Sequence, residues 1–246
     1  MNVLSTIIPI FIVILLGLAA RKKGLFSPEF MTQANRVVYY IGIPALIFSA
    51  VSESSLKTDM NISVILLTLL VILILFGLSC SITGFLKMQR HSKGSFIQST
   101  MHSNIGYIAL AVIYYYLGQA GFVKAAIIAS FVMILQNILA IGILQFYSEK
   151  NTKEPDLKDI LKKTLVNPVI LSALVGIIFS FLNLNLPLVL DRAIDILKGM
   201  ALPMALLIIG ASLSFEKVKS QFKHVIIASF IKLIISPGIG LVLYRL

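Results

Sequence analysis

Charged residues are scarce in this sequence of 246 residues, in which Asp, Glu, Lys and Arg make up only 13%, about half the share expected of a soluble domain. Apolar residues make up 58%, which is more apolar surface than a soluble globule could hide. The single cysteine, Cys80, excludes an intrachain disulfide, a paired-cysteine redox motif and a multi-thiolate metal cage. The composition therefore predicts an all-α integral membrane protein, with the lipid bilayer as its first partner.

Motifs of catalytic sites are missing as well. The sequence has no Gly-rich phosphate loop, no His-x-x-x-His pair, and no aspartate or glutamate deep in an apolar run. An intramembrane aspartyl protease and a carboxylate site for a tightly bound sodium ion are therefore disfavoured. We expect no enzymatic activity, no catalytic residue, no cofactor and no metal site.

Eight apolar runs each approach the ~17–25 residues that a tilted transmembrane helix needs. The first run is followed at once by Arg21, Lys22 and Lys23 and has no basic residue before it, the reverse of a secretory signal peptide. We expect this span to be retained, with the N-terminus outside. The eight expected spans are 3–20, 30–52, 62–86, 95–117, 122–147, 165–182, 190–214 and 224–243.

Lysine and arginine concentrate in alternate connecting segments. Fifteen of them lie in 21–36, 87–94, 148–163 and 215–223, against five in the termini and the other loops. The positive-inside rule places the first set in the cytoplasm. Membrane topology thus accounts for the net charge of +11, so we expect a multi-pass protein of the cell (plasma) membrane and no nucleic-acid partner.

The sequence also divides into two halves that match. The charged segment 148–163 predicts a cytoplasmic linker between 1–147, with five transmembrane helices, and 164–246, with three. By their cation content, equivalent loops of the two halves lie on opposite sides of the membrane. This predicts inverted five-helix repeats, an architecture found in many secondary transporters. The second repeat is expected to be incomplete. The alternative is coincidence, since prolines are common in membrane helices. At one spacing of 159 residues, matched helix breakers pair as Pro9 with Pro168, Pro28 with Pro187, and Pro44 with Pro203.

Polar side chains gather in the first half of the fourth span. They need internal partners or a water-filled cavity. One interpretation is hydrogen bonding between packed helices. The other is a discontinuous helix, whose freed N–H groups and Asn104 amide would hold a carboxylate. The residues are Gln98, Ser99, Thr100, His102, Ser103 and Asn104, followed by Gly106. His102 is a candidate for proton coupling or, alternatively, a neutral partner in a polar network.

Two later spans also carry polar residues. Gln136 and Asn137 point about 100° apart on a helix, so at most one is expected to line a cavity, and Asn137 is favoured. Lys232 lies near the middle of the eighth span, where a charge costs at least ~2.5–3.5 kcal/mol. We expect it to be functional, with snorkelling as the alternative. Lys124 and Lys198 lie near span ends, where snorkelling is expected.

Several segments carry a family resemblance. They are the helices around Pro9 and Pro44, SNIGYIALA at 103–111, LQNIL at 135–139, NPVILSALVGI at 167–177, ALPMALLIIGASL at 201–213 and KLIISPGIG at 232–240. Together they resemble the auxin efflux carrier family, which is related in fold to the bile acid/sodium symporters. The resemblance covers nearly the whole chain, and the short linker is similar to that of the bacterial members.

The resemblance implies a secondary active transporter, or permease, of small organic anions such as carboxylates. It would work by alternating access around a midplane crossover site. A homodimer is left open. The residues expected to bind substrate are Asn104, Gly106, Tyr107, Asn137, Pro44, Pro203 and Lys232.

Two features depart from the family pattern. A proline interrupts the fourth span of the family shortly after Asn-x-Gly, but none follows Asn104-Ile105-Gly106 here, so the expected break depends on Gly106 alone. A complete second repeat would also end about 60 residues beyond Leu246, so the ninth and tenth spans are expected to be absent. The alternative function is therefore a truncated, non-transporting membrane remnant or a subunit of the same fold.

Overall fold

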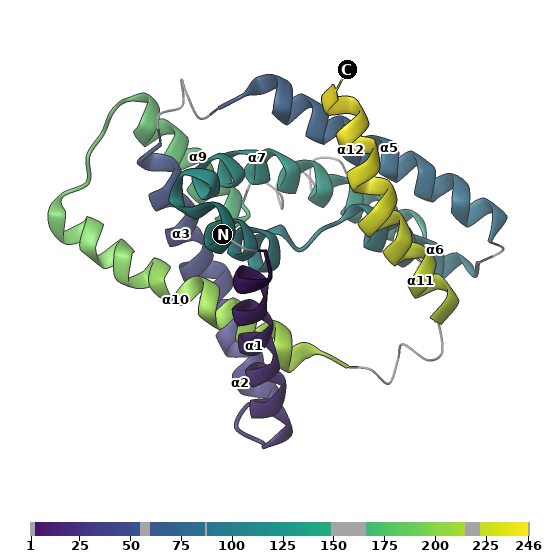
Figure 1. The fold of residues 1–246 in the computed structure, drawn as a ribbon, viewed down its shortest axis with the longest axis horizontal. Coiled ribbons are helices and arrows are strands. Elements are labelled where there is room, and N and C mark those ends of the chain that lie inside the picture. The colour runs from purple at the N-terminus through teal and green to yellow at the C-terminus, as the bar shows by residue number, and fades with distance from the viewer. Residues whose placement is uncertain (1–2, 55–59, 87, 149–165, 215–221, 246) are drawn as a thin grey trace. The chain divides into compact units, whose positions relative to one another are not determined.

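The computed structural model describes residues 3–54, 60–86, 88–148, 166–214 and 222–245 (Figure 1). The predicted linker 148–163, apart from Ser148, lies outside this part of the chain, as do Lys57, Lys217 and Lys219. All regular structure within the described part is helical. The elements are α1 (Val3–Lys22), α2 (Pro28–Val37), η1 (Val38–Gly42), α3 (Ile43–Ser52), α5 (Ile62–Phe85), α6 (Arg90–Met101), η2 (Ile105–Ala109), α7 (Leu110–Phe146), α9 (Pro168–Phe181), α10 (Leu188–Ser212), α11 (Phe222–Phe230), η4 (Ile231–Ile235) and α12 (Ser236–Arg245).

Within the described residues, five helical stretches are long and apolar enough to cross a membrane. The expected span 3–20 corresponds to α1, and the expected span 165–182 to the shorter apolar helix α9. One stretch combines two expected spans, which Gly118 separates because its φ of 69° is not helical. The five are Pro28–Ser52, Ile62–Phe85, Ser92–Phe146, Leu188–Ser212 and Phe222–Arg245.

The chain forms two compact units. Unit 1 comprises Met1–Met60, Asn104–Ser130 and Asn167–Leu213, and unit 2 comprises Asn61–Ser103, Phe131–Val166 and Ser214–Leu246. Each unit therefore combines segments from both sides of the linker. The compact bodies of the molecule do not coincide with the halves that the proline spacing relates.

In unit 1, α1 packs along α10 and crosses it at very close range (Figure 1). A Cβ added at Gly17 would overlap the carbonyl oxygen of Leu207, and one at Gly210 would overlap the carbonyl oxygen of Ile14. Only glycine permits backbones to approach this closely. At the end of α1, Arg21 donates from Nη1 to the carbonyl oxygen of Leu213 at 3.3 Å.

A second close pair in unit 1 joins α3 and α9. A Cβ added at Gly176 would lie 3.0 Å from the Val51 Cβ and 3.3 Å from the Phe48 carbonyl oxygen. The Phe48 and Phe179 rings meet edge to face at 5.2 Å, a favourable aromatic geometry. At the end of α9, the Ser180 hydroxyl donates to the carbonyl oxygen of Ser54 at 2.6 Å.

Unit 2 brings together α5, α6, the later part of α7 and the helices from α11 to α12 (Figure 1). The hydroxyls of Ser79 on α5 and Thr100 on α6 share a buried hydrogen bond of 2.6 Å. On another face of α6, a Cβ at Gly94 would lie 3.2 Å from the Ile143 carbonyl oxygen of α7. Small and hydroxyl residues thus let α6 pack closely on both neighbours.

Two π-helical turns precede prolines. In η1 the Ile43 N–H donates to Val38, and in η4 the Ser236 N–H donates to Ile231, so each bond spans five residues. Pro44 and Pro237 follow directly, and a proline lacks its own N–H and crowds the carbonyl four residues earlier. The wider turns accommodate these prolines. Pro203, the expected match of Pro44, instead lies inside the continuous helix α10.

Candidate functional site

The fourth expected span is interrupted, but not where the sequence analysis placed the break. Helix α6 ends at Met101, and His102 takes an extended conformation with φ −90° and ψ 111°. Residues 102–104 are not helical, whereas Gly106 is buried inside η2. The expectation that the break depends on Gly106 was therefore wrong. Asn104 begins the new helix as its N-cap, because its side-chain oxygen accepts from the Tyr107 N–H at 3.3 Å.

In unit 1, the residues after the break pack near the Pro44 turn. A Cβ at Gly106 would lie 4.0 Å from the Ile43 Cγ2 atom. The Tyr107 hydroxyl donates to the Asn35 side-chain oxygen at 2.8 Å, and η2 also packs against α10, the helix that carries Pro203. The Asn104 side chain is exposed. Unit 1 thus holds five of the predicted residues: Pro44, Asn104, Gly106, Tyr107 and Pro203.

In unit 2, Lys232 lies against the end of α6. Its ammonium group donates to the carbonyl oxygens of Ser99 at 3.0 Å and His102 at 2.6 Å. Carbonyls at a helix C-terminus lack partners within the helix and form its negative pole. The ammonium group therefore has polar partners inside unit 2. A snorkelling lysine would instead extend its ammonium group towards the membrane surface.

The fifth expected span contributes Gln136, not Asn137, to this region of unit 2. Gln136 is only 2% exposed and donates from Nε2 to the Met101 carbonyl oxygen at 2.9 Å. Asn137 is half-buried, and its side chain makes no hydrogen bond to the described residues. Two buried atoms, Gln136 Oε1 and His102 Nδ1, also find no partner in the described part of the chain. Unit 2 thus holds His102, Asn137 and Lys232 of the predicted residues.

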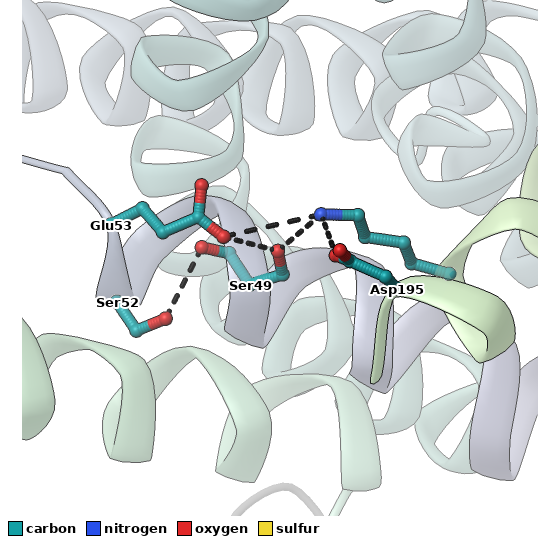
Figure 2. A network of polar contacts seen from close by, with 5 residues as sticks. Ser49, Ser52, Glu53 and Asp195 are labelled. Atoms are coloured by element: carbon teal, nitrogen blue, oxygen red, sulfur yellow. Dashed lines mark hydrogen bonds and ion pairs between the residues drawn. The ribbon is translucent and has the colours of Figure 1, made fainter. Parts of the chain in front are cut away.

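A charged cluster in unit 1 was missed by the sequence analysis (Figure 2). The Lys198 ammonium on α10 lies 2.5 Å from Asp195 Oδ1, donates to the Ser49 hydroxyl at 2.8 Å and lies 4.0 Å from Glu53 Oε1. Ser49 in turn donates to Glu53 Oε1 at 2.7 Å. The three-residue spacing of Asp195 and Lys198 could have predicted their ion pair. No sequence signal indicated that α3 would supply Ser49 and Glu53.

These residues, Ser49, Glu53, Asp195 and Lys198, are called the Lys198 cluster. The cluster borders a cavity of about 220 Å³ within unit 1. All of its members except Glu53 line this cavity. Pro203 also lines this cavity and a second one of about 270 Å³ beside Pro9. Among the described residues, no three His, Cys, Asp or Glu side chains come together as metal ligands. The remaining residues that line the first cavity are Leu46, Ala50, Tyr114, Tyr115, Gln119, Phe122, Gly199 and Leu202.

Comparison with known proteins gives one family and several distant relatives. Residues 2–246 match the family described as "Membrane transport protein". The "Putative malonate transporter" of Rhizobium meliloti is 26% identical over 225 residues, which cover 89% of this chain and 69% of that protein. An "Uncharacterized transporter" of Methanocaldococcus jannaschii is 24% identical over 99% of this chain and 79% of its own length. Another, of Methanothermobacter thermautotrophicus, is 23% identical over 95% of this chain and 75% of its own length.

Proposed function

The chain belongs to the membrane transport protein family, which is the auxin efflux carrier family that its sequence resembles. We propose that it is a secondary active transporter of small organic anions. The family match and the long apolar helices together indicate a multi-pass membrane transport protein. The substrate class rests on the chemistry of individual residues. We propose the cell membrane as its location, with the N-terminus outside.

The observation that carries the proposal is the position of Lys232 in unit 2. A lysine ammonium has three hydrogens, and the carbonyls of Ser99 and His102 accept two of them. The third hydrogen is left for an anion, and no carboxylate among the described residues pairs with the ammonium group. A charged hydrogen bond to a carboxylate is roughly twice as strong as a neutral one, so a carboxylate suits this position.

Residues after the break in unit 1 support anion binding through a second feature. The helical backbone that starts at η2 and continues into α7 has its positive pole near Asn104. We propose that Asn104, Gly106 and Tyr107, with the backbone near Pro44 and Pro203, contribute binding groups. Asn137 and the proton-coupling role of His102 remain proposals for unit 2.

Contacts in unit 1 support the inverted repeat. Gly17 packs against the Leu207 carbonyl and Gly176 against the Phe48 carbonyl. The two glycines are 159 residues apart in the sequence, and so are Phe48 and Leu207. The same spacing relates the two bonds at the helix ends, from Arg21 to Leu213 and from Ser180 to Ser54. These two pairs of equivalent positions make equivalent contacts, as expected of two repeats related by a pseudo-two-fold axis, although the second Arg21 bond, to the Ala211 carbonyl at 2.8 Å, has no such counterpart.

Alternating access requires bodies that move as wholes. Units 1 and 2 are the compact bodies of this chain, and each draws on both repeats. We therefore propose that the units, instead of the sequence halves, are the parts that move during transport.

Malonate is the first substrate to test, because a relative carries that word in its name. We expect proteoliposomes containing the full chain to take up labelled malonate. Lys232→Gln should lower uptake by at least about tenfold, since a charged hydrogen bond contributes ~1.5–3 kcal/mol. Lys124→Gln, which removes an exposed lysine on α7, serves as the matched control. Equal uptake by Lys232→Gln and Lys124→Gln would contradict the proposed role of Lys232.

A further inference from the structure

The Lys198 cluster of unit 1 has no part in the proposed anion transport, although three of its four members line a cavity. Its side chains come from α3 and α10 and converge on one ammonium group (Figure 2). The Lys198 side chain is 28% exposed, whereas those of Asp195 and Glu53 are about half exposed. The lysine is therefore partly desolvated while its carboxylate partners remain accessible.

The hydrogen bonds of the cluster leave groups of both kinds available. Two hydrogens of the Lys198 ammonium go to Asp195 and Ser49, and the 4.0 Å to Glu53 is too long for a third hydrogen bond. Among the described residues, Asp195 Oδ2 and Glu53 Oε2 accept no hydrogen bond. On the side of the cavity, one donor on Lys198 and one acceptor, Asp195 Oδ2, are thus free to meet a ligand.

The charges of the cluster select the kind of ligand. The members that line the cavity carry one positive charge, on Lys198, and one negative charge, on Asp195, whereas Glu53 lies outside the lining. A simple anion would be attracted by Lys198 but repelled by Asp195, and a simple amine would be attracted by Asp195 but repelled by Lys198. A molecule with an ammonium and a carboxylate close together can pair each of its charges with the opposite one.

The remaining cavity wall suits a small molecule of this kind. The cavity volume of about 220 Å³ far exceeds the ~10–15 Å³ that a single water molecule needs, which leaves room for a small solute. The Tyr114 and Tyr115 hydroxyls and the Gln119 amide make no hydrogen bond to the described residues, so they can bind further polar groups. Leu46, Phe122 and Leu202 supply an apolar wall for a short side chain. We propose that this cavity binds a small zwitterion, such as a small α-amino acid.

The test uses three probes with related skeletons and the purified full chain in lipid nanodiscs. L-alanine carries both charges, propionate only the carboxylate and ethylamine only the ammonium. Calorimetric titration should show L-alanine binding at least about tenfold more tightly than either other probe. L-alanine should also raise the unfolding temperature.

Variants separate a ligand site from a purely structural bridge. Lys198→Gln and Asp195→Asn should each weaken L-alanine binding by about tenfold or more. Arg192→Gln, an exposed cation on the same helix without an ion pair to the described residues, should bind L-alanine normally. Lys232→Gln should do the same, which keeps this proposal separate from the proposed transport site.

Three results would overturn the proposal. The first is no binding of L-alanine, which would leave the cluster as a bridge between α3 and α10. The second is propionate binding as tightly as L-alanine, which would indicate a simple anion site. The third is unchanged L-alanine binding in folded Lys198→Gln. If Lys198→Gln does not fold, unchanged binding in Asp195→Asn, whose carboxylate lines the cavity and is about half exposed, decides against the proposal.

Discussion

The carbonyl oxygen of His102 accepts a hydrogen bond of 2.6 Å from the ammonium group of Lys232, 130 residues later in the chain. His102 is the first residue after α6 ends, so its carbonyl has no partner within a helix. The lysine thus stabilises the open end of α6 and keeps its charge inside unit 2. Its third ammonium hydrogen is the one that we propose binds an anion.

Gln136 supports the same region of unit 2, and its contribution can be measured. Gln136→Leu removes the donor to the Met101 carbonyl and leaves that buried oxygen without a partner. We expect it to lower the free energy of unfolding by ~1–3 kcal/mol. Asn137→Leu, at the neighbouring half-buried position, should change it by less than ~0.5 kcal/mol. Thermal unfolding of both variants in detergent provides the comparison, and a larger loss for Asn137→Leu would contradict the supporting role given to Gln136.

Asn104 has a structural role that is separable from substrate binding. Asn104→Ala removes the N-cap of η2 and should cost ~0.5–2 kcal/mol of stability. Asn104→Asp keeps the cap but adds a negative charge, which should repel a carboxylate. We therefore expect Asn104→Asp to retain the unfolding temperature and to lose malonate uptake. Normal uptake by Asn104→Asp would exclude this residue from the anion site.

Much of the helical framework could be predicted from the sequence. The expected spans 62–86, 190–214 and 224–243 differ by a few residues at most from Ile62–Phe85, Leu188–Ser212 and Phe222–Arg245. Apolar run length determines these helices because the bilayer sets the length that must be covered. Pro28 also marks a helix start, because proline is favoured in the first turn of a helix.

The details of the site were less predictable, because they depend on contacts between distant segments. The break lies at 102–104, before Gly106, and Asn104 caps the helix that follows it. No proline stands near these residues to mark the break in the sequence. The choice of Gln136 over Asn137 depends on which helix face meets Met101. Lys198 was expected to snorkel, but α3 places Ser49 beside it.

The membrane topology gives a prediction for positions outside the described residues. Because fifteen of twenty loop and terminal cations lie in one set of segments, Asn2 should face outside and Lys158 should face the cytoplasm. With Cys80 replaced by serine, single cysteines at these two positions should react with an impermeant reagent from opposite sides. Labelling of both from the same side would contradict five spans in the first repeat.

Glycines at the helix crossings of unit 1 allow the repeat to be tested through stability. Gly17→Ala would place a methyl group against the Leu207 carbonyl oxygen, and the backbone there cannot rotate away as a side chain could. We expect a loss of ~1–3 kcal/mol, the usual cost of overpacking. Gly176→Ala, at the matched position, faces the Val51 side chain at 3.0 Å and the Phe48 carbonyl oxygen at 3.3 Å. It should also destabilise the protein, but by less than Gly17→Ala, because more space is available.

Gly142→Ala on α7 is the matched control for both substitutions, since an added Cβ there meets no atom within 4 Å. It should be neutral, or stabilise the protein by up to ~1 kcal/mol through better helix propensity. Unfolding temperatures of the three variants, measured in the same detergent, make the comparison. If Gly17→Ala and Gly142→Ala unfold at the same temperature, the close approach of α1 to α10 is not a stabilising contact. The pairing of Gly17 with Gly176 would then no longer support an inverted repeat.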